Sequence, residues 1–225
     1  MPDYQLLRKN MVESQVRTND VTDRRLLRAM LDLPREKFVP EALKALAYSG
    51  EGLALPKSVS GDGPRALPAP VATARLIQLA NIEPSYDVLE VGAATGYGTA
   101  IIADLAHSVV GLESDAGLAA AATTTLAAGK VTNATIKTGS LAAGAPDRGP
   151  YHVIIVSGAI PEVPAALFQQ LRQGGRLIAV IASGPIGRAT VFERYGKDGA
   201  VCSRVAFDLG APQLPGFARK PAFAL

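Results

Sequence analysis

A turn rich in small residues and a glutamate further along the chain are the most informative groups in the sequence. The turn, Gly92-Ala93-Ala94-Thr95-Gly96, follows one short apolar run, and Glu113 ends the next. Small side chains let the backbone approach a bound molecule closely, and a helix that begins after the turn offers free N–H groups. A carboxylate about 20 residues further on can accept hydrogen bonds from both hydroxyls of a ribose. Together these features predict a site for an adenosine-containing ligand.

The order of the glycines indicates which adenosine-containing ligand to expect. A dinucleotide site needs G-x-G-x-x-G, but Ala94 replaces the second glycine counted from Gly92, and Ile101 replaces the third counted from Gly96. With Glu90 before the turn, the order E-x-G-x-x-x-G resembles the first motif of class I methyltransferases. Their cofactor, S-adenosyl-L-methionine, has no pyrophosphate to cradle. The alternative is that these glycines only make a tight turn between a strand and a helix.

The elements that must position this turn read as an α/β fold. Short apolar runs alternate with helical stretches, which is typical of a parallel sheet buried on both faces. We therefore expect a Rossmann-like, doubly wound, mostly parallel sheet with an N-terminal helical region and a C-terminal β-hairpin. The expected strands are 87–91, 108–113, 134–138, 151–157 and 175–181, and the expected helices include 71–80 and 99–106.

The chain is expected to form one domain, 1–225, whose three parts differ in composition and in hydrophobic pattern. Residues 1–70 hold N-terminal helices, with Thr22 or Asp23 as a cap, followed by an irregular stretch rich in Gly, Pro and Ser. Residues 71–187 form the Rossmann-like core. Residues 188–225 hold two β-rich runs around a Gly-Lys-Asp-Gly turn, and a tail.

Several motifs, in the same order along residues 8 to about 185, resemble the protein-L-isoaspartate O-methyltransferase family. The segment PREKFVP at 34–40 is similar to the family's N-terminal signature, and LEVGAATGY at 89–97 is similar to its glycine motif. YHVIIVSGA at 151–159 and the VPAAL and GGRL segments around 163–177 resemble later motifs. The resemblance implies a methyltransferase in protein repair, which turns S-adenosyl-L-methionine into S-adenosyl-L-homocysteine while methylating a carboxylate of a protein or peptide.

The chain departs from this family in the loop where the resemblance implies that the methyl group meets the substrate. Aligning the family's final proline on Pro70 puts Arg65, Ala66, Leu67 and Pro68 in that loop. Ala66 then replaces the family's threonine and Pro68 its serine, so both hydroxyls are missing. Arg65 can pair with an anionic substrate, although arginines in loops are usually solvated.

A second departure concerns the turn that the resemblance implies for the adenine. The family's Gly-Asp-Gly appears here as Gly139-Ser140-Leu141, where Ser140 can accept the same hydrogen bond without a charge. The expected cofactor-binding residues are Gly92, Ala93, Ala94, Thr95, Gly96, Glu113, Ser114, Gly139, Ser140 and Leu141.

Methyl transfer to a carboxylate needs no general base, because a carboxylate with a pKa near 4 is already ionised at neutral pH. The sequence therefore names no catalytic residue. Two alternatives stay open. One is a methyltransferase of the same fold with another substrate, and the other is a catalytically silent protein that binds S-adenosylmethionine.

Composition argues against several other classes of protein. The net charge of +3 is spread along the chain, which gives no footprint for nucleic acid. A single cysteine, Cys202, allows no internal disulfide and indicates the cytoplasm, and an apolar strand around it predicts that it is buried. No Cys/His cluster has the spacing of a metal site. No apolar run approaches the roughly 18 residues of a membrane span.

Overall fold

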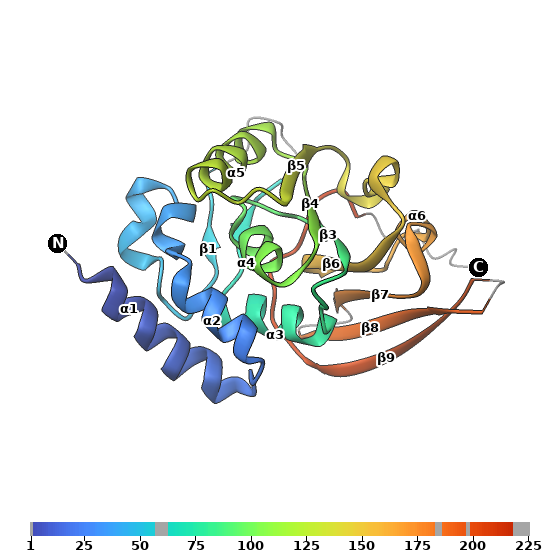
Figure 1. Ribbon diagram of the computed structural model, residues 1–225, viewed down its shortest axis with the longest axis horizontal. Helices are drawn as coiled ribbons and strands as arrows, with labels where there is room; N and C mark the ends of the chain where they lie inside the picture. The colour runs from blue at the N-terminus through green and yellow to red at the C-terminus, as the bar shows by residue number, and fades with distance from the viewer. Residues whose placement is uncertain (1, 57–62, 183–185, 197–198, 218–225) are drawn as a thin grey trace, which may run out of the picture.

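The computed structural model describes residues 2–56, 63–182, 186–196 and 199–217. At its centre lies a seven-stranded sheet with the order β5-β4-β3-β6-β7-β8-β9 (Figure 1). Strands β5, β4, β3, β6 and β7 run parallel, while β8 and β9 are antiparallel to their neighbours. The strands are β3 (Asp87–Val91), β4 (Ser108–Glu113), β5 (Ala134–Thr138), β6 (Tyr151–Ile160), β7 (Leu171–Ala182), β8 (Gly187–Tyr195) and β9 (Ala200–Asp208).

Helices alternate with the parallel strands, and a further group of helices precedes them. The α-helices are α1 (Tyr4–Met11), α2 (Arg24–Asp32), α3 (Pro70–Ala80), α4 (Tyr97–Leu105), α5 (Ala116–Ala128) and α6 (Ala165–Gln169). Shorter helical turns are η1 (Val12–Val16), η2 (Arg17–Asn19), η3 (Arg35–Phe38), η4 (Glu41–Leu46), η5 (Leu141–Ala143) and η6 (Pro146–Arg148). Two short strands, β1 (Leu53–Ala54) and β2 (Ala66–Leu67), pair with each other.

The central strand β3 shows why the sheet is buried on both faces. Side chains alternate along a strand, so Val88 points to one face and Leu89 and Val91 to the other. Val88 lies in a core that includes buried residues of α2, α3 and α4. Leu89 and Val91 lie in a second core with Leu141 and Leu167. Both faces of this part of the sheet are therefore covered, which confirms the expected doubly wound α/β fold.

The boundaries of the expected strands are confirmed at 87–91, 108–113 and 134–138. Strands β6 and β7 are longer than the sequence predicted. β6 extends at its end, where Ala159 and Ile160 pair with β7 beyond a shift in register, and β7 begins earlier, where Leu171 pairs with Tyr151. Strands β8 and β9 pair as an antiparallel hairpin, also as expected.

Local side chains explain where two of the helices begin. The Asp23 carboxylate accepts hydrogen bonds from the N–H groups of Arg25 and Leu26 and so caps α2, one of the two caps expected. Asp115 caps α5 in the same way through Gly117 and Leu118. Because Asp115 follows β4 so closely, α5 begins directly beside Glu113.

Two single residues, Cys202 and His152, show how position in the sheet decides the surroundings of a side chain. Cys202 is exposed rather than buried, because much of β9 lies at the open edge of the sheet. His152, near the start of β6, has a structural role: its Nδ1 accepts a hydrogen bond from the Asp87 N–H at 2.9 Å, and its ring stacks on Tyr86. Burial lowers the pKa of His152, in agreement with a neutral acceptor.

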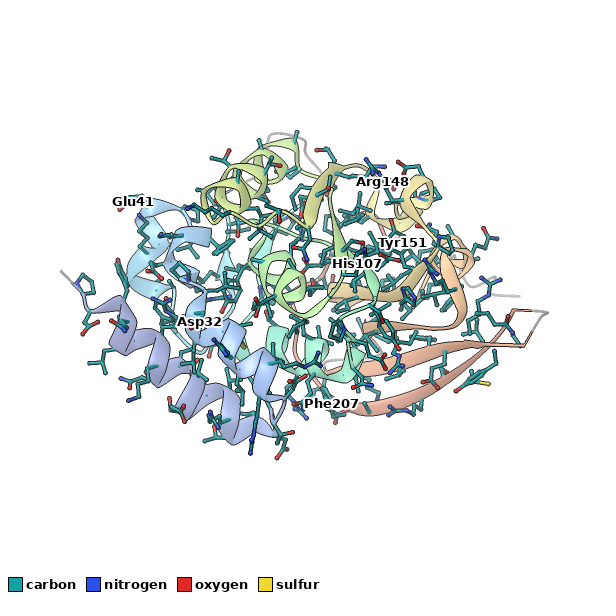
Figure 2. All side chains as sticks on the ribbon, viewed as in Figure 1. Asp32, Glu41, His107, Arg148, Tyr151 and Phe207 are labelled. Carbon is teal, nitrogen blue, oxygen red and sulfur yellow. The ribbon has the colours of Figure 1, made fainter. Side chains whose placement is uncertain are left out.

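Figure 2 labels two further polar side chains, those of His107 and Tyr151. His107 is exposed, as expected for a residue in the turn before β4, whereas Tyr151 is buried at the start of β6 and donates to the carbonyl of Ala145. Among the described residues, no helix is long and apolar enough to cross a membrane. Within the same residues, no three His, Cys, Asp or Glu side chains gather as a metal site would require.

Candidate functional site

The glycine turn, residues 92–96, connects β3 to α4 and is anchored to the end of β4. The N–H groups of Gly92 and Ala93 both donate to the carbonyl of Leu112, at 2.8 and 3.0 Å. Gly92 and Gly96 have φ angles of +87° and +89°, a region that favours glycine. Because β3 and β4 are parallel neighbours, the turn and Glu113 meet at the same edge of the sheet. The structure therefore brings together the two features singled out in the sequence.

Glu113, the last residue of β4, is completely buried and held by backbone donors. Its Oε2 accepts from the N–H of Ala94 at 2.6 Å. Its Oε1 accepts from the N–H groups of Ser114 at 2.9 Å and Asp115 at 3.1 Å. These bonds fix the carboxylate in one orientation beside the glycine turn.

Arg65 completes the surroundings of Glu113 and contradicts the expectation of a solvated loop arginine. Its side chain is 2 % exposed and forms two hydrogen bonds with the carboxylate, from Nε to Oε1 at 3.0 Å and from Nη2 to Oε2 at 2.5 Å. A buried carboxylate needs a partner for its charge, and the guanidinium fork matches its two oxygens. Arg65 is therefore a partner of Glu113 in this structure.

Leu214, which no sequence pattern singled out, packs against Gly92 of the turn. A Cβ atom placed on Gly92 would lie 2.9 Å from Leu214 Cδ2 and 3.6 Å from Arg65 Nη2. A Cβ atom on Gly158 would lie 2.7 Å from Leu214 Cγ. Leu214 thus fits against two positions without side chains. We call the side chains of Arg65 and Leu214 the cover.

Backbone hydrogen bonds hold the segment that carries Leu214. After β9 the chain returns to the end of β6, where Ala159 donates to the carbonyl of Pro212 at 2.8 Å, and Leu214 donates to the carbonyl of Ala159 at 2.9 Å. The docked segment is Pro-Gln-Leu-Pro at 212–215. It contains no distinctive motif, so no local pattern in the sequence predicted its position.

A second buried carboxylate, Glu90 of β3, supports the turn from the side of α4. Its oxygens accept from Thr99 Oγ1 at 2.5 Å and from Ser157 Oγ at 2.6 Å. Burial raises the pKa of Glu90, the two hydroxyls oppose that shift, and the charge of Glu113 adds to it. A Cβ atom on Gly98 would collide with the Glu90 carboxylate, so the glycine leaves space for this network. The sequence motif includes Glu90, but it did not predict that Thr99 and Ser157 would be its hydrogen-bond partners.

Arg35, from the PREKFVP segment, ties three parts of the site together. It is fully buried, and it donates to the carbonyl of Ala47 at 2.8 Å and to the carbonyl of Pro68 at 2.7 Å. Its guanidinium lies over the ring of Tyr97, 4.6 Å from the centroid, at the start of α4. Tyr97 is therefore a packing residue in this structure. We call Arg35, Glu90, Thr99 and Ser157 the frame.

The remaining residues expected in the loop lie close to the glycine turn. Ala66 and Leu67 form β2 and pair with Ala54 and Leu53, which places Arg65 at the end of that strand. Pro68 is buried and held by Arg35. Ser58 and Ser60 carry other hydroxyls shortly before this loop in the sequence, and both lie outside the described residues.

The residues expected around an adenine follow β4 and β5. Ser114 is half-buried, and both its N–H and its hydroxyl lie within hydrogen-bond distance of Glu113 Oε1. Gly139 donates to the carbonyl of Glu113 at 2.9 Å, which joins the ends of the two strands. Ser140 is exposed and precedes η5, whereas Leu141 is buried. The glycine turn, residues 113–115 and residues 139–141 thus meet at one edge of the sheet.

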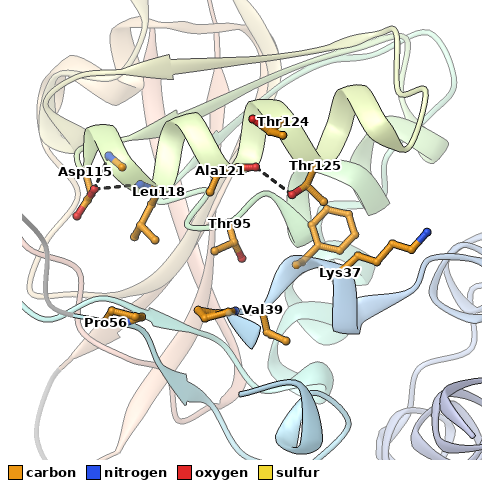
Figure 3. Close-up of a pocket in the computed structure, with 12 residues that line it drawn as sticks. Lys37, Val39, Pro56, Thr95, Asp115, Leu118, Ala121, Thr124 and Thr125 are labelled. Atoms are coloured by element: carbon orange, nitrogen blue, oxygen red, sulfur yellow. Dashed lines mark hydrogen bonds between the residues drawn. The ribbon is translucent and has the colours of Figure 1, made fainter. Parts of the chain in front are cut away.

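A cavity of about 560 Å³ lies on the other side of the turn, between α5 and residues 37–40 (Figure 3). Thr95 projects toward it, and its hydroxyl is buried without a hydrogen-bond partner. Glu113, Arg65 and Leu214 are not part of its wall. The space is therefore open beside α5 and filled beside Glu113. The wall consists of Lys37, Phe38, Val39, Pro40, Pro56, Thr95, Asp115, Gly117, Leu118, Ala121, Thr124 and Thr125.

Comparison with known families and proteins gives a consistent result. The family model described as protein-L-isoaspartate(D-aspartate) O-methyltransferase matches residues 7–206. A protein-L-isoaspartate O-methyltransferase of Koribacter versatilis is 37 % identical over 180 residues, covering 80 % of this chain and 78 % of that protein. The enzyme of the same name from Serratia proteamaculans is 39 % identical over 182 residues, covering 81 % of this chain and 82 % of that protein.

Solved structures agree on the fold. A protein-L-isoaspartate O-methyltransferase superposes with a TM-score of 0.78 at 24 % identity, covering 93 % of this chain and 66 % of that chain. A Plasmodium falciparum protein assigned the same activity, in complex with S-adenosyl-L-homocysteine, gives a TM-score of 0.74 at 21 % identity, covering 96 % of this chain and 100 % of that chain. At these identities the likeness concerns the architecture alone.

Proposed function

Since the chain belongs to the protein-L-isoaspartate(D-aspartate) O-methyltransferase family, we propose that it transfers a methyl group from S-adenosyl-L-methionine to the carboxylate of an isoaspartyl residue in a damaged protein. The observation that carries this proposal is the meeting of the glycine turn with Glu113, inside a chain that matches the family over residues 7–206. A buried carboxylate oriented by the N–H of Ala94 suits the hydroxyls of a ribose.

The donors and acceptors of this edge fit an adenosyl group. In the proposal, the backbone of Gly92, Ala93, Ala94, Thr95 and Gly96 lies along the cofactor, while Glu113 and Ser114 hold the ribose. Gly139, Ser140 and Leu141 hold the adenine, with Ser140 as an uncharged acceptor. The group to be transferred is a methyl on a sulfonium, which supplies an electrophilic carbon when the cofactor is bound.

The rest of the proposed chemistry depends on positioning. The acceptor carboxylate is ionised at neutral pH, so the chain needs to hold it in line with the methyl group and exclude water. The loop 65–68 and the cavity beside α5 border the turn where this must occur. No side chain is required to remove a proton, and the proposal therefore assigns no catalytic acid or base.

A second candidate is methylation of a different carboxylate by the same fold. The loop favours it, because Ala66 and Pro68 lack the hydroxyls that the family resemblance implies at these positions. Hydroxyls that contact a substrate contribute about 1 kcal/mol each, so their loss changes substrate preference without affecting the cofactor.

One assay tests both candidates. The full chain is incubated with radiolabelled S-adenosyl-L-methionine and an isoaspartyl peptide, and the control is the same peptide with a normal aspartyl residue. Transfer to the isoaspartyl peptide alone supports repair activity. Transfer only to other acidic peptides replaces the first candidate by the second, and no transfer to any acceptor removes both.

The proposal also includes the setting in which the chain acts. We place the activity in one domain made of residues 1–70, 71–187 and 188–225 together, since the loop, the core and the C-terminal segment all border the glycine turn. A cytoplasmic location follows from the single cysteine and belongs to the same proposal.

A further inference from the structure

The carboxylate of Glu113 has no capacity left for a ribose in this structure. It accepts six hydrogen bonds: two from Arg65, two from the N–H and hydroxyl of Ser114, and one each from the N–H groups of Ala94 and Asp115. A carboxylate offers about four lone-pair positions, so its acceptor sites are saturated. The three backbone donors belong to the scaffold, whereas Arg65 comes from a separate loop. Arg65 is the partner that can be exchanged.

Leu214 blocks the approach along the backbone of the turn. Its two methyl carbons would lie 2.9 and 3.1 Å from a Cβ atom placed on residue 92, and the leucine is itself only 6 % exposed. All five residues of the glycine turn are buried. A molecule that lies along this backbone must therefore take the place of Leu214.

The two halves of the cover come from distant parts of the sequence but lie together. A Cβ atom on Gly63, two residues before Arg65, would contact Pro215 at 3.6 Å. A Cβ atom on Gly52 would lie 3.8 Å from Pro212. The loop that carries Arg65 and the segment that carries Leu214 are thus neighbours, and movement of one affects the support of the other.

We propose that the cover is an autoinhibitory device: Arg65 and Leu214 close the cofactor site, and S-adenosyl-L-methionine binds only when it displaces both. This inference rests on the proposed function, because it assumes that the cofactor uses Glu113 and the glycine turn. The ribose hydroxyls and the guanidinium of Arg65 compete for the same two oxygens. The affinity measured for the cofactor is then the intrinsic affinity multiplied by the fraction of molecules whose cover is open.

Calorimetric titration of the full chain with S-adenosyl-L-homocysteine tests this inference. Arg65→Met keeps an unbranched apolar stem and removes the guanidinium with its hydrogen bonds, and Leu214→Ala removes the methyl groups against Gly92. Each variant is expected to bind the nucleoside about tenfold more tightly than the unchanged chain, since each raises the open fraction. Arg75→Met is the matched control, because Arg75 lies over the ring of Phe207 and outside the site; its affinity is expected to stay unchanged.

The outcomes separate this inference from the proposed function. If the unchanged chain binds as tightly as both variants, the cofactor site stands and the cover is refuted. Circular dichroism shows whether all the proteins are folded. If they are folded and neither the unchanged chain nor either variant binds, both the proposed cofactor site and the cover are refuted. The double variant Arg65→Met with Glu113→Gln is expected to lose the gain seen in Arg65→Met. If it keeps that gain, Arg65 does not act through Glu113 and the inference is wrong.

Discussion

The frame and the cover contact the same glycine turn, but they are built differently. The frame consists of groups that other parts of the fold hold in place, such as Glu90 between two hydroxyls and Arg35 between two carbonyls. The cover consists of two side chains that occupy features a nucleoside would use, namely the Glu113 oxygens and the surface of Gly92. Burial alone therefore does not distinguish a structural residue from one that a ligand can displace. What separates them is whether a ligand can supply the same contacts.

We therefore expect substitutions in the frame to change the stability of the fold, and substitutions in the cover to change cofactor binding. Damage to the frame leaves buried polar groups without partners or forces atoms into contact, so it lowers the free energy of unfolding. Damage to the cover opens space that the cofactor can fill. The following variants of the frame test whether it behaves as permanent structure.

The largest effect is expected for Gly98→Ala. The added methyl would collide with the buried Glu90 carboxylate, and overpacking of this kind costs about 3 kcal/mol in the free energy of unfolding. Urea denaturation measures the loss. Gly210→Ala is the matched control, since no atom lies within 4 Å of a Cβ atom at that position. Equal stability of the two variants would show that Glu90 moves freely and is not part of a rigid frame.

A smaller loss is expected for Arg35→Met. The variant keeps only the apolar stem and leaves the carbonyls of Ala47 and Pro68 without their donors, which costs about 2 kcal/mol in the free energy of unfolding. Thermal and urea unfolding both report it. Arg28→Met makes the same change in an exposed pair with Asp32 and is expected to leave stability unchanged. A loss as small as that of the control would place Arg35 outside the frame.

The smallest effect is a pH dependence that Glu90→Gln removes. Burial raises the pKa of Glu90 above its ordinary value, so the folded chain binds a proton more readily than the unfolded chain. This contribution to stability is complete below about pH 4.5 and is lost as the pH rises through the folded pKa. Relative to the unchanged chain, the variant should therefore gain stability between about pH 5 and about pH 8, as measured by urea unfolding at both values.

Glu162→Gln is the control for this pH dependence, because Glu162 is exposed. It should follow the unchanged chain at both values. If Glu90→Gln follows it too, Glu90 is already ionised throughout this range, and the frame carries a buried negative charge.

Much of the fold could be predicted from the sequence because its signals are local. The runs at 87–91, 108–113 and 134–138 are short, contain β-branched residues and are bounded by turns, and each is a strand with those bounds. The meeting of Gly92 and Glu113 followed from the topology, since neighbouring parallel strands end at the same edge. These expectations needed no knowledge of distant contacts.

The contents of the site could not be predicted in the same way. Arg65 is buried because Glu113, far away in sequence, supplies a matching charge, and loop residues carry no pattern that reveals such a partner. Leu214 docks through two backbone hydrogen bonds to Ala159, which any residue type can form. Cys202 stands among apolar residues in the sequence, but the position of β9 at the edge of the sheet exposes it.

The return of the chain from β9 to the end of β6 has a consequence during protein synthesis. The ribosome makes the glycine turn, Glu113 and Arg65 well before Leu214, because domains emerge from the amino end first. Until residues 212–214 have left the ribosome and reached Ala159, one half of the site has no protein atoms over it. The leucine that covers Gly92 is therefore added to the chain long after the turn that it covers.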